Sequence, residues 1–382
     1  MDLILAALCS ILGIEIVFRK LYDKISSTKH HGETYYSWSF VSPQGIPISN
    51  LKGDLKLSIH PFTVYSNAPN QKTDQFSINA NGIRTNGGID PDNIPPSQRR
   101  ILILGGSTAF GTGLNSNTET YAAHISRILK NVCVLNAGVI GFISGQELVQ
   151  LITDLVVYNP HLVITLDGFN DLFIQLRKAK DWPGKGANEF EGLISRLVAL
   201  YKIETSMFYG FLHCFRGIYS FLLTIYRIIK NVSGIILGKT LKTYIQSYMP
   251  FISVKEEMKE SNLMTFEDIV EEYTSNLAKI TRIGKGFGFK HLAVMQPALL
   301  SDRENFTPNG RFHFSKEQIN LYESFLESAM KRLQELNVEH YCAHYDFKTN
   351  HSLFLDDIHL TSKGFNKLAF TTVNILKQKE MI

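Results

Sequence analysis

A serine in the first third of the chain and an aspartate–histidine pair near its end could together form a nucleophilic site. Ser107 follows Gly105 and Gly106 at the end of a short apolar run, where small residues allow a sharp turn that exposes the hydroxyl. Asp356 and His359 lie three residues apart. A serine hydroxyl becomes a nucleophile when an imidazole takes its proton and an acceptor fixes the imidazole tautomer. We therefore predict Ser107, His359 and Asp356 as a catalytic triad.

Two further motifs could supply hydrogen-bond donors to such a site. Gly141 ends the segment 136–141, and Asn170 lies in the segment 168–171. Attack on an ester carbonyl places negative charge on its oxygen, which backbone amides and an asparagine side chain can stabilise. We predict an oxyanion hole made of the Ser107 amide, Gly141 and Asn170. Each residue alone fits an ordinary turn, so the prediction depends on the order in which the motifs occur.

Short apolar runs after Arg100 predict the strands that position these motifs. The runs alternate with amphipathic segments, as in a parallel sheet covered by helices on both faces. Ligands bind at the carboxyl ends of the strands in such sheets. We predict a doubly wound α/β domain, in which the motifs share one sheet edge and the strands cover residues 101–104, 132–135, 162–166, 291–295 and 339–344.

Helix starts in this domain are predicted by two capping boxes. Ser144 is followed three residues later by Glu147, and Ser315 is followed by Gln318. Apolar residues at helical spacing follow the second box, and a further stripe of this kind covers residues 266–280. These segments are the predicted covering helices.

The first residues of the chain predict membrane attachment. Residues 3–18 are largely apolar and are followed by Arg19 and Lys20, so we predict an anchor in residues 1–26. The stretch is shorter than the roughly 20 apolar residues of a spanning helix, which leaves an interfacial, re-entrant or signal-like role open. The side of the membrane on which the rest of the chain lies is left unresolved.

Two regions lie outside the core of the predicted domain. Residues 27–99 are polar and rich in turn formers, which predicts an extended or short-stranded N-terminal segment. Residues 100–382 form the predicted catalytic domain, interrupted by a helical insertion at about 182–262. The apolar residues 193–241 of this insertion favour packing on the domain or on a second copy, with a membrane-surface or lid element as the alternative.

Composition excludes some classes of partner. The 39 Lys and Arg residues exceed the 35 acidic residues by a net charge of +4, without a long basic run, so nucleic acid is not an expected partner. The four cysteines lie far apart in apolar surroundings, which fits buried thiols better than a disulfide framework or a zinc site. His340, His344 and His351 are not joined by carboxylates at ligand spacing. We predict neither a metal nor an organic cofactor.

Taken together, the motifs resemble those of the SGNH (GDSL-like) hydrolase superfamily. The resemblance covers residues 100–180 and 265–378 and rests on four blocks, namely Gly105-Gly106-Ser107-Thr108, Gly141, Gly168-x-Asn170-Asp171 and Asp356-x-x-His359. Gly106 stands where the Gly-Asp-Ser form has aspartate, a variant similar to that of a membrane-attached branch. The resemblance implies a flavodoxin-like three-layer sandwich with a five-stranded parallel sheet, and esterase, deacetylase, lipase or acyltransferase activity.

These observations favour a serine ester hydrolase acting on an O-acyl group of a carbohydrate or a lipid. An O-acyltransferase that uses a glycan hydroxyl as acceptor shares the first half-reaction and stays open, as does a non-enzymatic envelope scaffold that keeps the fold. An α/β-hydrolase is disfavoured because its Gly-x-Ser-x-Gly elbow fails at Ala109. The sequence does not predict the acyl group or the oligomeric state.

Overall fold

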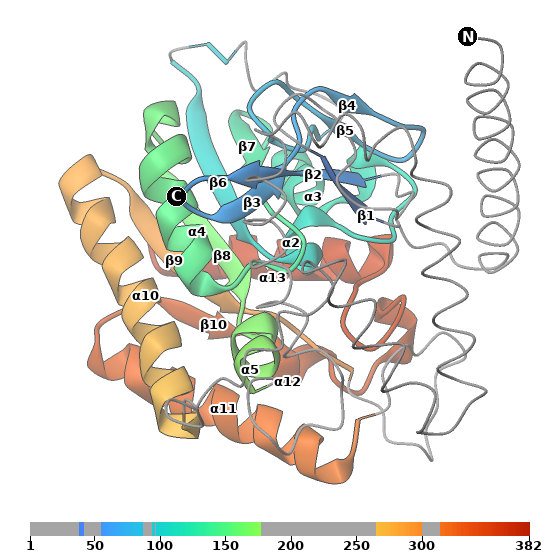
Figure 1. The fold of residues 1–382 in the computed structure, drawn as a ribbon. Coiled ribbons are helices and arrows are strands. Elements are labelled where there is room, and N and C mark those ends of the chain that lie inside the picture. The colour runs from blue at the N-terminus through green and yellow to red at the C-terminus, as the bar shows by residue number, and fades with distance from the viewer. Residues whose placement is uncertain (1–37, 42–54, 87–93, 96, 177–264, 300–313) are drawn as a thin grey trace, which may run out of the picture. The chain divides into compact units, whose positions relative to one another are not determined.

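The computed structural model describes residues 38–41, 55–86, 94–95, 97–176, 265–299 and 314–382 (Figure 1). All of them belong to one unit of the chain, made of residues 35–187 and 262–382. The predicted anchor at 1–26 and the whole of the predicted insertion at 182–262, including its apolar part at 193–241, lie outside the described residues. Within the described residues, no helix has the length and apolar character needed to cross a membrane.

A parallel sheet of five strands forms the centre of the described unit. Its strands are β6 (Arg99–Gly105), β7 (Val132–Asn136), β8 (Leu162–Asp167), β9 (Lys290–Met295) and β10 (His340–Cys342). They lie in the order β10-β9-β8-β6-β7, and every pair is parallel. The predicted parallel sheet is therefore confirmed. The last strand is shorter than predicted, because Ala343 has helical backbone angles and His344 begins the short helix α12 (His344–Phe347).

The order of the strands defines where a ligand can approach the sheet. Numbered along the chain, the five strands run 2-1-3-4-5 across the sheet, which is the flavodoxin-like order. Chain connections leave in opposite directions from β6 and β8, and in sheets of this kind ligands bind at such a switch point, outside the carboxyl ends of the strands. The Ser107 motif follows β6, the Gly141 motif follows β7 and the Asn170 motif follows β8.

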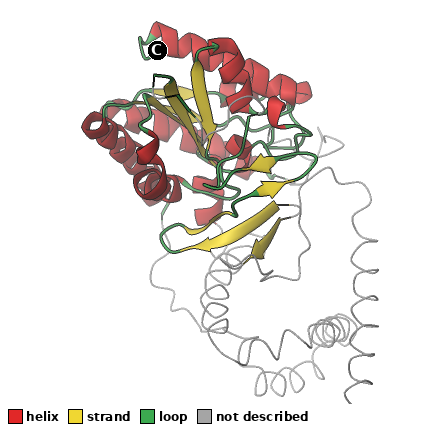
Figure 2. Ribbon diagram, turned by 90° about the horizontal axis from the view of Figure 1, so that it is seen from above, coloured by secondary structure: helices red, strands yellow, loops and turns green. Residues whose placement is uncertain are grey.

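Helices cover both faces of the sheet, as Figure 2 shows. Side chains on a strand point alternately to its two faces, and β6 divides in this way. Ile101 and Ile103 pack in one cluster, which includes α3 (Tyr121–Leu129) and α13 (Ser362–Gln378). Leu102 and Leu104 pack in the other, where the covering helices are α4 (Ser144–Gln150), α5 (Phe169–Leu176), α10 (Phe266–Phe287) and α11 (Lys316–Glu335). The predicted three-layer arrangement is confirmed.

One predicted capping box is present and the other is absent. At the start of α11, Gln318 N donates to Ser315 Oγ and Ser315 N donates to Gln318 Oε1. At α4, Glu147 is fully buried and does not reach back to the helix start, and Ile143 N donates to Gln146 Oε1 instead. The prediction for Ser144 and Glu147 was wrong because burial of the glutamate overrides the local pattern.

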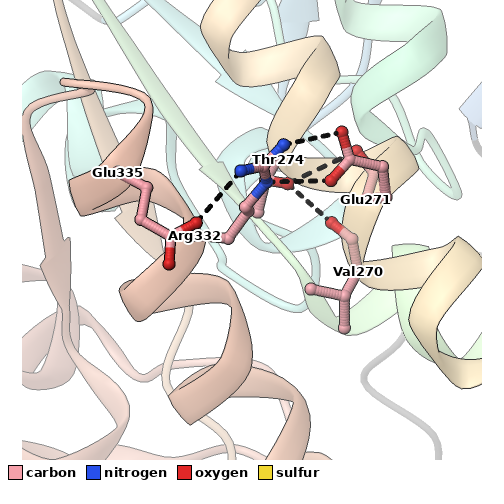
Figure 3. A network of polar contacts seen from close by, with 5 residues as sticks. All are labelled: Val270, Glu271, Thr274, Arg332 and Glu335. Atoms are coloured by element: carbon pink, nitrogen blue, oxygen red, sulfur yellow. Dashed lines mark hydrogen bonds and ion pairs between the residues drawn. The ribbon is translucent and has the colours of Figure 1, made fainter.

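Helices α10 and α11 are joined at the surface by an arginine (Figure 3). Arg332 Nε and Nη2 donate to the two carboxylate oxygens of Glu271 at 2.8 and 3.2 Å, and Nη1 donates to Glu335 at 3.0 Å. Thr274 Oγ1 donates to the Val270 carbonyl one turn earlier. A two-pronged arginine–carboxylate pair fixes orientation better than a single contact, so this pair adds an oriented surface contact to two helices whose buried faces pack in the core.

Short strands make up the described part of the N-terminal segment. β1 (Trp38–Val41), β2 (Leu55–His60) and β3 (Val64–Asn67) form a three-stranded sheet, and β4 (Gln71–Lys72) pairs with β5 (Ser77–Ile78). Arg84 then forms a bridge with Asn136, the last residue of β7. This segment therefore packs against the end of the sheet that carries the predicted site. The remaining short helices are α2 (Ser107–Phe110), η1 (Asn117–Glu119), η2 (Leu151–Leu155), η3 (Val156–Tyr158) and η4 (His351–Leu353).

Candidate active site

Ser107 lies at the turn between β6 and α2. Gly105 ends the strand with φ +144°, and a β-carbon there would collide with the Leu166 carbonyl of the neighbouring strand β8. A glycine is therefore required at the point where the chain leaves the sheet. Ser107 itself is half-buried and is the first residue of α2, which places it just beyond the carboxyl end of β6.

The structure brings the three predicted triad residues together. His359 Nε2 lies 2.8 Å from Ser107 Oγ, and His359 Nδ1 lies 2.7 Å from Asp356 Oδ2. Asp356 is 1% exposed and His359 is 7% exposed. The serine and the other two residues are more than 240 positions apart in the sequence, so the sheet topology alone brings them into contact. The result is one continuous hydrogen-bonded chain from carboxylate to hydroxyl.

Backbone amides hold Asp356 in its ionised form. Its Oδ1 accepts hydrogen bonds from the amides of Ile358 at 2.8 Å and His359 at 2.7 Å. Burial by itself would raise the pKa of Asp356, but the charge and ring of His359 and these two amides lower the pKa to about 2. An ionised carboxylate only accepts hydrogen bonds, so His359 Nδ1 carries the proton. When the imidazole is neutral, Nε2 is the acceptor for the Ser107 hydroxyl.

Contacts around the triad restrict the turn that carries Asp356 and His359. Leu355 N donates to the His359 carbonyl at 2.7 Å, which closes the turn. Thr108 Oγ1, one residue after the nucleophile, lies 3.4 Å from the Ile358 carbonyl. The acid–base turn is thereby tied to the helix that carries the serine.

Gly141 and Asn170 lie at the same end of the sheet and are linked through the loop 138–142. Asn170 Nδ2 donates to the Phe142 carbonyl at 2.9 Å. The same nitrogen lies 2.5 Å from the position that a β-carbon would take at Gly106, so the amide group is next to the start of α2. Gly141, in the left-handed region with φ +77°, precedes Phe142. All four sequence motifs therefore meet at this edge.

The N–H groups predicted as oxyanion donors are available for a hydrogen bond among the described residues. Neither the Ser107 amide nor the Gly141 amide takes part in a hydrogen bond among the described residues. Asn170 uses one N–H for Phe142 and has a second. The Ser107 amide, the Gly141 amide and one N–H of Asn170 therefore stay candidate donors to a carbonyl oxygen bound beside Ser107.

Sequence reasoning missed three residues of the N-terminal segment that support this site. Tyr65 Oη donates to the Ile140 carbonyl at 3.0 Å, and Asn67 Nδ2 donates to the Gly138 carbonyl at 3.0 Å. Arg84 Nη1 donates to the carbonyls of Phe110 and Gly111 at the end of α2. Residues 63–67, Thr-Val-Tyr-Ser-Asn, show no regular alternation of polar and apolar types, so no local pattern indicated the strand or the loop that it contacts.

Three carboxyl groups are buried behind the Asn170 motif. Glu147, Asp167 and Asp171 are at most 3% exposed. Burial, followed by mutual repulsion, raises the pKa of Glu147 well above its ordinary value and that of Asp167 to about 7. Burial also raises the pKa of Asp171 to about 6, against the hydrogen bonds from Ser144. Among the described residues, several oxygens of these carboxyl groups have no hydrogen-bond donor. A proton shared between Glu147 and Asp167 supplies a donor to them.

The described residues offer no group of three or more His, Cys, Asp or Glu that could hold a metal ion. His344 is buried, and its ring packs edge-on against Tyr322 with centroids 5.3 Å apart. Its Nδ1 accepts a long hydrogen bond of 3.4 Å from the Ala298 amide. This histidine serves the packing between α12 and α11.

The strand order and the Asp356–His359–Ser107 chain together give the arrangement that serine-nucleophile enzymes use. No model of a known protein family matches the sequence, and no curated protein matches it.

Several solved structures of esterases are similar to the chain. The acetyl xylan esterase AlAXEase has 10% identity and a TM-score of 0.38, over 72% of this chain and 98% of that one. A putative lipolytic protein of the G-D-S-L family from Desulfitobacterium hafniense has 10% identity and a TM-score of 0.39, over 72% and 99%. A variant of the acetylxylan esterase Axe2 from Geobacillus stearothermophilus has 13% identity and a TM-score of 0.38, over 74% and 95%. Function in this chain has to be argued from its own residues.

Proposed function

We propose that this chain is a serine ester hydrolase that removes an O-acyl group from a carbohydrate or a lipid. The observation that carries the proposal is the hydrogen-bonded chain from Asp356 through His359 to Ser107 at the switch point of the sheet. An accidental contact between residues so distant in sequence would not also place an ionised carboxylate on one ring nitrogen and a hydroxyl on the other.

In the first half-reaction, Ser107 Oγ attacks the ester carbonyl while His359 Nε2 takes the hydroxyl proton. The carbonyl oxygen becomes negatively charged, and the amides of Ser107 and Gly141 with the Asn170 side chain donate to it. The imidazolium that forms is stabilised by the ionised Asp356. Collapse of the intermediate breaks the bond to the alcohol, which leaves with the proton from His359. The acyl group is then held as an ester of Ser107.

In the second half-reaction, water attacks the acyl group. His359, neutral again, takes a proton from the water, and the same three donors hold the new oxyanion. Collapse releases the carboxylic acid and returns the proton to Ser107. No metal or organic cofactor is needed for any step.

The Ser107→Ala variant tests the proposal. Wild-type protein and the variant would be assayed with p-nitrophenyl acetate, an acetylated oligosaccharide and a micellar lipid ester. We expect turnover by the wild type of at least one of them, loss of that turnover in the variant, and covalent labelling by a fluorophosphonate only in the wild type. Full activity of a folded Ser107→Ala protein would overturn the assignment.

We also propose that residues 1–26 attach the protein to a membrane. Support comes from the apolar stretch at 3–18 and the basic pair that follows it. The full-length protein should sediment with membranes and resist a carbonate wash, whereas a chain that lacks residues 1–26 should not. Equal release of both proteins by the wash would contradict the proposal.

A further inference from the structure

We propose that Tyr65, from the N-terminal strand β3, is a positioning residue that holds the Gly141 amide as an oxyanion donor. This inference rests on the function proposed above and adds to it a residue outside the α/β domain. Tyr65 is 3% exposed, and its hydroxyl donates to the Ile140 carbonyl at 3.0 Å.

The contact matters because of which peptide group it touches. The Ile140 carbonyl and the Gly141 N–H belong to the same planar peptide unit. In a trans peptide the C=O and N–H bonds point in opposite directions, so a bond that fixes the carbonyl also fixes the direction of the amide. Hydrogen bonds in a chain also polarise one another, so a donor on the carbonyl strengthens the N–H as a donor.

The turn formed by the loop would not fix the direction of this peptide by itself. Phe142 N donates to the Val139 carbonyl at 3.2 Å, so Ile140 and Gly141 are the central residues of a β-turn, and type I and type II turns differ in the direction of the peptide between these two residues. Gly141 has φ +77°, a region that glycine enters freely and that other residues rarely adopt. The carboxyl end of the loop is held by Asn170, which donates to the Phe142 carbonyl. The peptide between Ile140 and Gly141 has Tyr65 as the donor to its carbonyl. The tyrosine ring also packs edge-on against Phe142, with centroids 5.4 Å apart.

Tyr65 is itself held rigidly against the loop. Asn67, on the same strand, donates to the Gly138 carbonyl at 3.0 Å. Gln146 of α4 donates to the Thr63 carbonyl at 2.8 Å. The strand is thus fastened on both sides of Tyr65 to the segment 138–146, so the hydroxyl has little freedom to leave the Ile140 carbonyl.

A close contact couples Tyr65 to Gly141 directly. A β-carbon at Gly141 would lie 2.8 Å from Tyr65 Oη, closer than real β-carbons approach other atoms. The hydroxyl therefore fills the space that any side chain at position 141 would need. This contact gives an independent test of the proposal.

The first experiment measures kcat and KM for Tyr65→Phe on the ester that the wild type hydrolyses. The substitution keeps the ring packing on Phe142 and removes only the hydroxyl. We expect kcat to fall about tenfold with KM within twofold, because the donor remains but is less well held; outright removal of an oxyanion donor costs roughly 10²- to 10³-fold. Tyr65→Phe with kcat within twofold of wild type would overturn the proposal.

Tyr121→Phe is the matched control. Tyr121 is also fully buried, and its hydroxyl donates to Thr372 Oγ1 at 2.7 Å between α3 and α13. This variant loses a comparable buried hydrogen bond, and we expect its kcat to stay within twofold of wild type. Equal losses of kcat in both variants would mean that destabilisation explains the effect, which would also overturn the proposal.

The second experiment combines Tyr65→Phe with Gly141→Ala. Removal of the hydroxyl makes room for the new β-carbon, so the double variant should be at least as active as Gly141→Ala alone. If the two substitutions acted independently, their fold-losses in kcat would multiply in the double variant. Such a multiplied loss would count against the coupling between Tyr65 and Gly141. Ser107→Ala in the same assay separates the two proposals. Activity in the Ser107→Ala variant overturns both of them. If Ser107→Ala loses activity but Tyr65→Phe keeps the kcat of wild type, only the role of Tyr65 is overturned.

Discussion

The side-chain nitrogen of Asn170 lies 2.5 Å from the position of a β-carbon at Gly106, the residue before the nucleophile. Two unbonded atoms do not approach this closely, so any residue other than glycine at 106 would displace the Asn170 amide. Gly106 stands where the Gly-Asp-Ser form has aspartate. In this chain the glycine leaves room for the side-chain amide of a predicted oxyanion donor.

Gly106→Ala should therefore reduce catalysis with little effect on folding. We expect kcat to fall by about 10²-fold, the lower end of the loss on removing an oxyanion donor, because Asn170 has to move away. Gly286→Ala is the control, since a β-carbon at Gly286 in α10 meets no atom within 4 Å. Steady-state kinetics of both variants, with circular dichroism to check folding, would decide; an unchanged kcat in Gly106→Ala would refute the prediction.

Asp356→Asn should reverse the tautomer of His359. The asparagine can present an N–H to His359 Nδ1, which moves the proton to Nε2 and leaves no base for Ser107. A loss of roughly 10⁴-fold in kcat is expected from such a change. Residual activity within tenfold of wild type would show that the carboxylate does not control the imidazole.

The stability of Asp356→Asn supplies a second measurement. The pKa of Asp356 is about 2 in the native state and about 3.9 in an unfolded chain. Because its pKa is lower in the native state, the ionised Asp356 stabilises the fold at pH values above the pKa of the unfolded chain. This stabilisation is lost as the pH falls through the native pKa. The stability difference between the two proteins should thus be larger at pH 7 than at pH 3, by about 1 kcal/mol. Urea unfolding at both pH values measures it.

The sequence was sufficient to predict the sheet and the proximity of Ser107, His359 and Asp356. Ser107 and Asn170 each follow a short apolar run, and strand ends of a parallel sheet must meet at one edge. Asp356 and His359 could be identified because base catalysis by an imidazole demands an acceptor close to it. In these cases a chemical requirement restricts both the residue type and its place relative to a strand.

The supporting residues could not be predicted because their role depends on packing between distant segments. Tyr65 is one tyrosine on a short strand, and nothing local to it indicates that it reaches a loop 75 residues later. The capping box at Ser144 failed for a related reason. Glu147 has the right spacing for a cap, but the fold buries it beside Asp167, and burial outweighs the weak local preference.

Arg84 should be important for stability although it belongs to the N-terminal segment. Its guanidinium is fully buried, donates to the carbonyls of Phe110 and Gly111 at 3.0 and 2.9 Å, and lies over the Phe110 ring. Arg84→Met keeps much of the volume but leaves these carbonyls without that donor. We expect a loss of about 3 kcal/mol in the free energy of unfolding.

Two further variants test the cause of that loss. Arg84→Lys should not restore stability, because an ammonium group lacks the planar fork that serves both carbonyls. Arg100→Met should cost less than about 0.5 kcal/mol, because the side-chain hydrogen bond that Arg100 makes among the described residues is a 3.3 Å contact with the Pro95 carbonyl at the surface. Full stability of Arg84→Lys would show that charge, and not geometry, is what the site needs.

The buried carboxyl groups should make stability fall as the pH rises. The pKa of Asp167 is raised to about 7 and that of Asp171 to about 6, whereas unfolded carboxyl groups titrate near 4. Between pH 4 and 7 the native state thus holds protons that the unfolded state has lost. The contribution of these groups to the free energy of unfolding is therefore fully present below pH 4. It is lost as the pH rises through 7.

Glu147→Gln should reduce this dependence, because an amide supplies a donor to Asp167 without a titrating proton. We expect the stability of the variant relative to wild type to increase from pH 4 to pH 8, by up to about 1.4 kcal/mol per pH unit for one proton. His124 and His291, whose pKa values burial lowers to about 4 and about 3, act in the opposite direction but are present in both proteins, so they cancel in the difference. Glu327→Gln, an exposed glutamate on α11, should leave the difference flat. A flat difference for Glu147→Gln as well would mean that the three carboxyl groups do not retain their protons in the folded protein.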